Sequence, residues 1–389
     1  MKKFFRELND CAVSMFTINR QGVAILIFLP IIYTLLFAGL FYKNSLTNIP
    51  VIICNLDDGS AGRSLVEDFM NTPELKVISV EGDALDDEKF LREDTAAGVV
   101  VIPKDFSNKI ARGENVSVEL VANYSSSVIG GTVARAVQSV VATKNAEVLI
   151  NRRIAAGWNE TQASAQLSAS SRIFYNPTGG YTDFFLAALI LHAGQIATVF
   201  VLGPSLAIRK KYRGENLFRN PARCLGAKIF LYTLFESAVM AICLAIGIKF
   251  FGMICRGNPS EILILVAAYV ACVTAFGLMM GALAREPHQA IMWSLVYVMP
   301  SILFANVTWP RTSMDNVSLF LSYIMPIGYA ANDLRNFLVK GSVAGVEFHI
   351  FILLLMGGIF LTAAVGVLKF KGAKNFAGDN AQGIQSANT

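Results

Sequence analysis

Residues 209–223 read RKKYRGENLFRNPAR, and this short basic stretch lies between two long apolar runs. Six of its fifteen residues are Lys or Arg. Short loops rich in Lys and Arg are found on the cytoplasmic side of a membrane. The stretch therefore predicts a cytoplasmic loop, and its position sets the orientation of the apolar runs on both sides.

The composition of the chain is typical of an integral membrane protein. Of its 389 residues, 54% are hydrophobic and only 16% are charged, and the mean hydropathy is +0.51. Water-soluble globular proteins rarely reach these values. Many cations outside the acidic segment 43–181 flank apolar runs, so we interpret the net charge of +5 as a topology signal. The pattern argues against a surface that binds nucleic acid.

Six apolar runs are close to the twenty residues that a membrane-spanning helix requires. They cover residues 22–42, 184–208, 225–253, 262–284, 290–307 and 348–368. With the basic stretch inside, short loops and tails carry fourteen Lys and Arg on the inner side and four on the outer side. This bias predicts cytoplasmic N and C termini.

A seventh apolar segment, residues 317–331, is too short to cross the membrane. Pro326 and Gly328 interrupt it. We expect it to lie in the outer interface or to re-enter the outer leaflet, because irregular backbone at membrane depth needs cover from protein or water.

The order of these features predicts five parts of the chain. They are an amphipathic interfacial helix over 1–21, a first span over 22–42, an extracytoplasmic α/β domain over 43–181, a membrane domain over 182–370 that contains the loop 209–224, and a cytoplasmic tail over 371–389. The first helix is predicted because apolar residues recur at helical spacing, namely Phe4, Leu8, Cys11, Ala12 and Met15. The alternative is a polar tail in which these apolar residues have helical spacing by chance.

The α/β domain is predicted from short apolar runs that alternate with amphipathic stretches. The expected strands are 49–54, 75–80, 97–102 and 116–122, and the expected helices are 61–70, 86–92 and 104–112. A long helical pattern follows over 128–156 and places Val133, Val137, Val140, Lys144 and Val148 on one face. The predicted fold class is thus an α-helical membrane protein with six transmembrane helices, an inserted extracytoplasmic α/β domain and a long stalk helix.

Common enzymatic motifs do not occur in the sequence. It contains no GxxxxGK[ST] phosphate loop, and no HExxH, CxxC or GxSxG pattern. Its three histidines are dispersed, and of its six cysteines only Cys54 and Cys255 are expected to meet an oxidising compartment. We therefore expect no catalytic residues, no metal site and no cofactor bound by this chain.

Several short motifs resemble those of one family, the ABC-2 type permeases, in the branch with a large extracytoplasmic domain between spans 1 and 2. In the outer region, Trp309, Pro310 and Met314 resemble one turn of that family, and Tyr323, Pro326, Tyr329, Leu334, Arg335 and Gly341 resemble the segment that follows it. Residues 101–107, 112–114 and 175–177 are similar to family elements in and after the soluble domain. Met325 stands where the family usually has Asn.

The basic stretch resembles the coupling loop of the same family. The matching residues are Arg213, Gly214, Glu215 and Pro221, and Gly226-Ala227-Lys228 opens the next span, although the usual Thr is absent. The resemblance implies that Arg213, Gly214, Glu215, Leu217, Phe218, Arg219 and Pro221 form the contact with an ATPase. A loop that is basic only for reasons of topology is the alternative.

The resemblance also implies a function. The expected protein is the membrane-spanning permease subunit of an ATP-driven ABC exporter in the bacterial inner membrane, moving an amphiphilic drug, lipid, polysaccharide or peptide out of the cytoplasm. Its expected partners are separate ABC ATPase subunits that use ATP and Mg, a second copy or a paralogous permease, membrane lipids and, as a further candidate, a periplasmic membrane-fusion protein. The alternative is a membrane-anchored receptor or scaffold whose outer domain binds a ligand or an envelope partner.

Glu236 is the only carboxylate well inside an uncharged run. Counting 1.5 Å per residue from Lys228 places it about 12 Å in from the cytoplasmic side. Residues at similar depth on other spans are Thr274 or Gly277, Tyr297 and Thr362. Two hypotheses remain open: Glu236 lines a substrate path and favours cationic or hydrogen-bonding amphiphiles, or it is a protonated residue bonded between helices.

Overall fold

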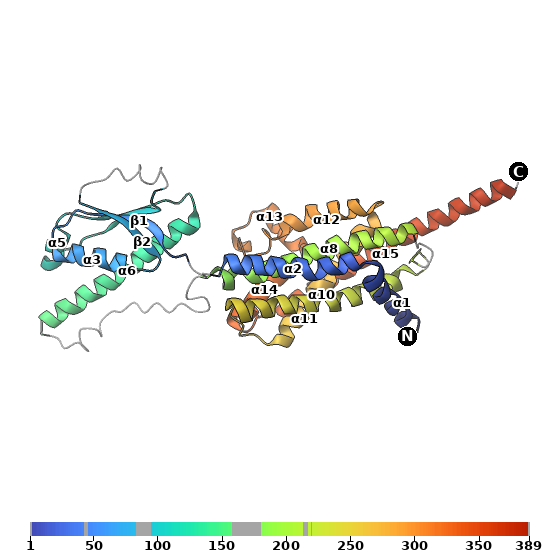
Figure 1. The fold of residues 1–389 in the computed structure, drawn as a ribbon, viewed down its shortest axis with the longest axis horizontal. Coiled ribbons are helices and arrows are strands. Elements are labelled where there is room, and N and C mark those ends of the chain that lie inside the picture. The colour runs from blue at the N-terminus through green and yellow to red at the C-terminus, as the bar shows by residue number, and fades with distance from the viewer. Residues whose placement is uncertain are drawn as a thin grey trace. The chain divides into compact units, whose positions relative to one another are not determined.

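The computed structural model describes residues 2–42, 46–82, 95–157, 180–212, 217–218 and 220–387. The chain forms two compact units, which are drawn in Figure 1. Met1–Asn44 and Phe174–Thr389 make up the helical unit, and Ser45–Ile173 make up the sheet unit. Each unit has a hydrophobic core of its own.

Among the described residues, five helices of the helical unit are long and apolar enough to cross a membrane. They are α2 (Arg20–Leu40), α8 (Ala187–Tyr212, preceded by the π-helical turn η2, Thr182–Leu186), α10 (Pro221–Phe251), α11 (Pro259–Leu283) and α15 (Val346–Ala387). Each matches an apolar run identified in the sequence. The chain is therefore a helical membrane protein, and its last helix continues through most of the predicted tail.

The run expected to form a sixth span contains a shorter helix. α12 (Pro287–Ser301) has 15 residues, which is about 22 Å at 1.5 Å per residue and less than the roughly 30 Å of a bilayer core. Pro300 has no N–H to donate, and the amides of Leu303 and Phe304 turn back to the carbonyls of Pro300 and Ser301. The helix therefore ends well before residue 307, and a sixth complete span stays a prediction.

α8 lies at the centre of the helical unit, where it packs against α2, α10, α11 and α12. Of its spanning segment, 89% is buried, whereas α2 and α15 are 22% and 11% buried. α8 and α11 approach closely because Gly203 and Gly281 face each other: a Cβ atom on Gly281 would lie 2.5 Å from the carbonyl oxygen of Gly203.

The N-terminal segment forms α1 (Lys2–Val13) and the π-helical turn η1 (Ser14–Ile18) before α2 begins. α1 packs against α10, and Cys11 and Met15 are fully buried, whereas Phe4 and Phe5 are exposed. The predicted helix is present, and part of its apolar face is covered by this chain. The position of α1 at a membrane surface stays a prediction.

The described part of the sheet unit contains four strands in the order β2-β1-β3-β4. β1 (Ile49–Asn55) runs parallel to β2 (Leu75–Glu81) and β3 (Gly98–Ile102), and β4 (Glu119–Ala122) pairs antiparallel with β3. α3 (Ser60–Met70) and α5 (Phe106–Arg112) follow β1 and β3. All four strands and both helices lie within three residues of the predicted bounds; the helix expected at 86–92 lies outside the described residues.

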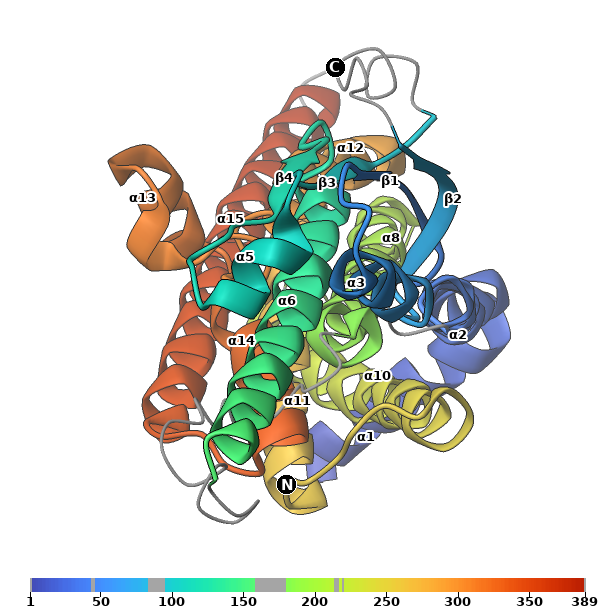
Figure 2. The same cartoon turned by 90° about the vertical axis from the view of Figure 1, so that its left-hand side faces the viewer.

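The long helix α6 (Ser127–Ala155) is a layer of the sheet unit, so its prediction as a stalk was wrong. Val133, Ala136 and Val137 are buried in the same core as the strands, and Figure 2 shows α6 beside α3 on one face of the sheet. Near its end, Arg152 donates to the carbonyl of Ile110 in α5. The apolar face of α6 was predicted correctly. It packs on the sheet, however, so the helix is not a separate stalk.

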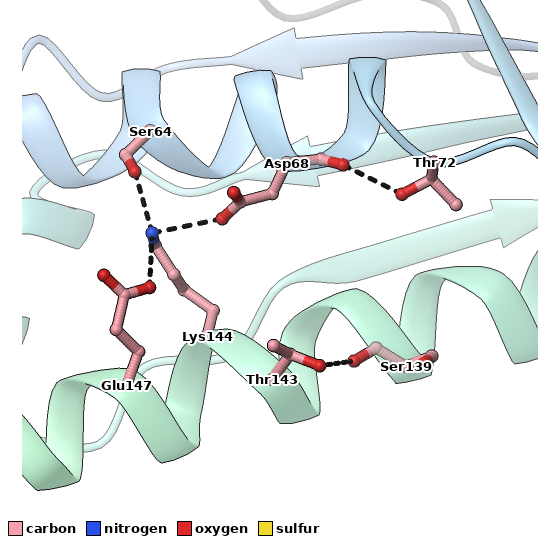
Figure 3. A network of polar contacts seen from close by, with 7 residues as sticks. All are labelled: Ser64, Asp68, Thr72, Ser139, Thr143, Lys144 and Glu147. Carbon is pink, nitrogen blue, oxygen red and sulfur yellow. Dashed lines mark hydrogen bonds and ion pairs between the residues drawn. The ribbon is translucent and has the colours of Figure 1, made fainter.

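Lys144 of α6 is the polar member of that face, and three oxygens hold its ammonium group (Figure 3). Nζ donates to Ser64 Oγ at 2.7 Å and lies 3.1 Å from Asp68 and 2.9 Å from Glu147. Burial alone would lower the pKa of Lys144, but the hydrogen bonds and charges of Glu147 and Asp68 outweigh it and raise the pKa. The contact joins α6 to α3.

All six cysteines belong to the described part of the chain, and they form no disulfide. Cys54 lies buried on β1. Cys255 lies in the turn between α10 and α11 and is exposed, whereas the five other cysteine side chains are buried.

Candidate coupling loop and membrane path

The predicted coupling loop connects α8 to α10. Arg213, Gly214, Glu215 and Arg219 lie outside the described residues, whereas Leu217, Phe218 and Pro221 lie within them. Pro221 is the first residue of α10, a position where the missing N–H of proline costs no helical hydrogen bond. Pro221 therefore marks both the end of the loop and the start of α10.

Leu217 and Phe218 fix the described part of the loop to the helical unit. Leu217 is fully buried in a cluster that we call the loop-end cluster, which includes Met15, Leu26, Leu206, Leu217, Leu225 and Leu368. Phe218 lies against Gly372, where an added Cβ atom would be 3.0 Å from the Phe218 Cβ. Lys228 Nζ donates to Ser205 Oγ at 3.2 Å beside the loop. The loop is thus anchored to helices α2, α8, α10 and α15.

The neighbouring turn between α11 and α12 is fixed by polar contacts. Lys371 Nζ donates to the carbonyls of Ala282 and Leu283 at 2.8 Å each, at the C-terminus of α11, where carbonyls lack helical partners. Glu286 and Gln289 form a reciprocal capping box that starts α12. The end of α11 and the start of α12 therefore lie beside the turn of α15 that carries Lys371.

Glu236 is buried in α10 and only 1% exposed. Neither carboxyl oxygen has a hydrogen-bond partner among the described residues. Gly194 of α8 packs beside it, because a Cβ atom there would lie 3.3 Å from Glu236 Oε1 and 2.7 Å from the Met240 sulfur. Thr274 of α11 is also buried, and its hydroxyl has no partner in the described part of the chain.

Tyr297 and Thr362, the other residues expected near Glu236, use their hydroxyls elsewhere. Tyr297 donates to the carbonyl of Ile324, and its ring stacks on Phe276. Thr362 is exposed and donates to Ile359 of its own helix at 2.9 Å. Of the four residues predicted to line the path, Glu236 and Thr274 therefore remain as candidates for a buried polar site.

The segment after α12, which the sequence places on the outer side, is organised around Arg311. Pro310 and Met314 flank the short helix η3 (Arg311–Ser313), and Pro326 separates α13 (Asn316–Ile324) from α14 (Ile327–Lys340). The Arg311 guanidinium donates to Ser322 Oγ at 2.8 Å and to the Gly328 carbonyl at 3.0 Å. One arginine thus joins η3 to both of the following helices.

The aromatic residues predicted in this segment surround the same guanidinium. Its carbon lies 4.9 Å from the centre of the Tyr323 ring and 4.8 Å from that of Tyr329. The Tyr329 hydroxyl also donates to the Tyr323 carbonyl at 2.9 Å. Arg311 is one of the four Lys and Arg predicted on the outer side, and the sequence pattern did not indicate that it is the centre of this motif.

Two further contacts attach α14 to its neighbours. Asp333 is 2% exposed, and its Oδ2 lies 2.5 Å from Nδ1 of His349 at the start of α15. Arg335 donates to Asn332 Oδ1 at 2.6 Å and lies over the ring of Phe184. The depth of this segment in a membrane stays a prediction, but its packing on the helical unit is shown.

A buried polar contact between α8, α11 and α12 was also missed. The Tyr269 hydroxyl donates to Gln195 Oε1 at 2.7 Å, and Ser301 Oγ lies 3.5 Å from the same oxygen. Polar residues inside apolar runs signal such contacts, but their pairing depends on helix rotation, which the sequence pattern does not give.

A comparison with protein-family models matches residues 20–365 to a family described as ABC-2 family transporter protein. The match begins with α2, includes the whole sheet unit and ends within α15. The chain belongs to the ABC-2 transporter family.

Named relatives of this ABC-2 protein are distant but cover most of its length. The probable multidrug ABC transporter permease YbhR of Escherichia coli K12 is 23% identical over 327 residues, which is 82% of this chain and 85% of the relative. The inner membrane transport permease YhhJ of the same strain is 22% identical, covering 84% and 86%. The linearmycin resistance permease protein LnrN of Bacillus subtilis is 18% identical, covering 88% and 92%.

Membership in this family places the chain among the membrane permeases of ABC transporters. ABC-2 permeases lack an ATP-binding motif of their own and work with ABC ATPase subunits. The anchored loop between α8 and α10 and the buried Glu236 are therefore the two places where coupling and transport chemistry can be sought.

Proposed function

We propose that this chain is the permease subunit of an ATP-driven exporter in the bacterial inner membrane. It moves an amphiphilic substrate out of the cytoplasm, and separate ATPase subunits bind ATP and Mg. The names of the relatives support export of a drug-like compound, because one is a multidrug permease and another a linearmycin resistance permease. In this proposal both termini and the loop 209–224 are cytoplasmic.

The observation that carries the proposal is the anchoring of a charged loop inside an ABC-2 chain. Leu217 is buried in the loop-end cluster, and Phe218 lies against α15. A force applied to the loop would therefore act on the ends of α2, α8, α10 and α15 together. A motor protein that binds Arg213, Glu215 and Arg219 would have a direct mechanical connection to the helices.

A second permease protomer, identical or paralogous, belongs to the same proposal. The long helices at the edge of the helical unit, α2 and α15, have mostly exposed apolar surface. Lipids and the second protomer would share that surface. A periplasmic membrane-fusion protein remains a further candidate partner on the outer side.

Reversing the three loop charges tests the coupling role. We expect R213E, E215R and R219E together to abolish copurification of the ATPase and substrate-stimulated ATP hydrolysis. Single exposed ion pairs contribute only about 0–1 kcal/mol, so the three changes are made at once. Pull-down of the tagged full chain from its native membrane, followed by an ATPase assay, measures the effect.

A matched triple variant provides the control. K76E, K104E and E119R change three exposed charges of the sheet unit with the same signs. They should leave ATPase binding and hydrolysis at the wild-type level. Normal ATPase recovery and normal stimulated hydrolysis with the loop variant would contradict the assignment of residues 209–224 as the docking site.

A further inference from the structure

Four buried oxygens without partners lie along one side of α10. They are Thr233 Oγ1, Ser237 Oγ and the two carboxyl oxygens of Glu236. None of them has a hydrogen-bond partner among the described residues. Residues three and four apart are neighbours on a helix surface, so these groups form one polar strip. The large majority of buried side-chain polar atoms in proteins are hydrogen-bonded, which makes a strip of four oxygens without partners unusual.

The strip lies where α10 packs against α8. Glu236 Oε1 and the Met240 side chain occupy the space beside Gly194, so α8 presents only backbone at this point. Further along the same face of α10, the buried Cys243 contacts the hydroxyl of Thr34 in α2. The face of α10 that carries Glu236 therefore packs against both α8 and α2.

Thr274 lies at the same level on a fourth helix. Gly277 of α11 packs against Val199 and Leu202 of α8. Because α8 and α11 run parallel, a residue one turn before Gly277 is level with about residue 196 of α8, close to Gly194. The hydroxyl of Thr274 thus adds a fifth buried oxygen without a partner in the described part of the chain.

The strip contains acceptors but no cation. The nearest basic residue along α10 is Lys228, eight residues or about 12 Å away, and its ammonium group is bound to Ser205. A carboxylate taken out of water needs a positive partner or a proton. The surrounding side chains, Met240, Cys243 and Leu244, are apolar and suit the body of a hydrophobic molecule.

We propose that Glu236, with the hydroxyls of Thr233, Ser237 and Thr274, binds the ammonium or guanidinium group of the transported substrate. The inference rests on the proposed transport function and names the substrate class as cationic amphiphiles. The N–H groups of the cation donate to the carboxylate and to the hydroxyl oxygens. The apolar part of the substrate packs on the Met240 side of α10.

Ligand binding to the purified full chain in lipid nanodiscs tests this site without an ATPase. Two probes share the same alkyl chain and dansyl fluorophore, and one ends in an ammonium group while the other ends in a hydroxyl group. We expect E236Q to lower the affinity for the ammonium probe by about tenfold or more, which is the usual effect of losing a charge-assisted hydrogen bond. The affinity of the hydroxyl probe should remain unchanged.

Three further variants separate charge from packing. E236D keeps the charge and should retain the preference for the ammonium probe. T274V keeps the shape of Thr274 and should lower the affinity for the ammonium probe less than E236Q does. E261Q removes an exposed carboxyl at the start of α11 and should change neither affinity.

Equal affinity of wild type and E236Q for the ammonium probe would overturn the inference. An equal loss of affinity for both probes in E236Q would also overturn the inference, because that result indicates altered packing. If the ATPase copurifies and export proceeds while either result is obtained, only the cation site fails. If binding depends on Glu236 but no ATPase is recruited, the transport function fails and the cation site stands.

Discussion

At the scale of single residues, Asp57 shows how the sheet unit fixes a loop. The Ser107 hydroxyl donates to Oδ2 at 2.6 Å, the Ser107 amide donates to Oδ1 at 3.1 Å, and the Gly59 amide donates to Oδ2 at 3.1 Å. The Ser107 oxygen in turn accepts from the Ala61 amide at 3.0 Å. One carboxylate and one hydroxyl thereby join the loop after β1 to the start of α5.

These contacts predict a loss of stability in acid. Burial alone would raise the pKa of Asp57, but the hydrogen bonds from Ser107, Gly59 and Gly62 outweigh it and lower the pKa below 3.8. A group with a lowered pKa stabilises the folded state above its unfolded pKa, and this contribution disappears as the pH falls through the folded pKa. The melting temperature of the sheet unit should therefore fall below about pH 4.

D57N should remove this acid dependence and cost about 1–3 kcal/mol at neutral pH, because hydrogen bonds to a charged acceptor are lost. Calorimetry of the full chain in nanodiscs at several pH values measures both effects. D58N, which changes an exposed neighbour, is the control and should behave as wild type. An unaltered acid transition in D57N would show that other carboxyl groups cause it.

At the scale of helices, the contact between α8 and α11 depends on the absence of side chains. A Cβ atom on Gly281 would lie 2.5 Å from the Gly203 carbonyl oxygen and 3.0 Å from the Leu206 Cβ. Both distances are shorter than normal contacts, and a backbone atom cannot move aside as a flexible side chain can. Helix α11 would have to shift away from the centre of the helical unit.

We therefore expect G281A to destabilise the helical unit by about 1–3 kcal/mol, the usual cost of overpacking. G358A on α15 is the matched control, because an added Cβ atom there meets nothing within 4 Å. The control should be neutral or slightly stabilising, since alanine favours helix. Thermal unfolding in detergent compares the two variants, and equal melting temperatures would disprove the close α8–α11 contact.

Elements with regular apolar patterns could be predicted from the sequence. Strands β1 to β4 and the five long helices lie where the patterns place them, because strands alternate with amphipathic stretches and membrane spans leave apolar runs of about twenty residues. The partner of a face is less predictable: Val133 and Val137 mark the buried side of α6, but nothing local shows that it covers a sheet. The apolar run 290–307 does not show where α12 ends, because the helix stops just after Pro300 while the run continues to residue 307.

The candidate site was predictable only in part for a similar reason. Glu236 stands out as a charge inside an uncharged run, and the structure buries it. Counting residues gives the depth of Tyr297 and Thr362 but not the direction in which they point. Arg311 escaped notice because its acceptors, Ser322 and Gly328, become neighbours only after α13 and α14 have folded back on η3.

At the scale of the whole molecule, the distribution of Lys and Arg predicts the orientation of the chain. Reporter proteins fused after Lys374 or within Arg209–Arg223 should read cytoplasmic. A reporter placed after Asn115, in the sheet unit, should read extracytoplasmic, because the expected inner loops carry most of the basic residues. Paired alkaline phosphatase and fluorescent-protein fusions distinguish the two sides.

The decisive position is the basic loop. An extracytoplasmic reading there would invert the topology and would place the sheet unit in the cytoplasm. It would also remove any access of a cytoplasmic ATPase to Leu217 and its neighbours. A reading on the same side from the loop and from residue 115 would show instead that the number of spans between them is even.

The exposure of Cys255 gives the native chain one accessible site for chemical labelling. Thiol-reactive probes require an accessible sulfur, and the five other cysteine side chains are buried. A maleimide dye or spin label should therefore attach at a single position, in the turn between α10 and α11, without any substitution. That turn is joined to α14 by the hydrogen bond from the Arg256 amide to the Leu338 carbonyl. A label there would report on movements of the neighbouring ends of α10, α11 and α14 during a transport cycle.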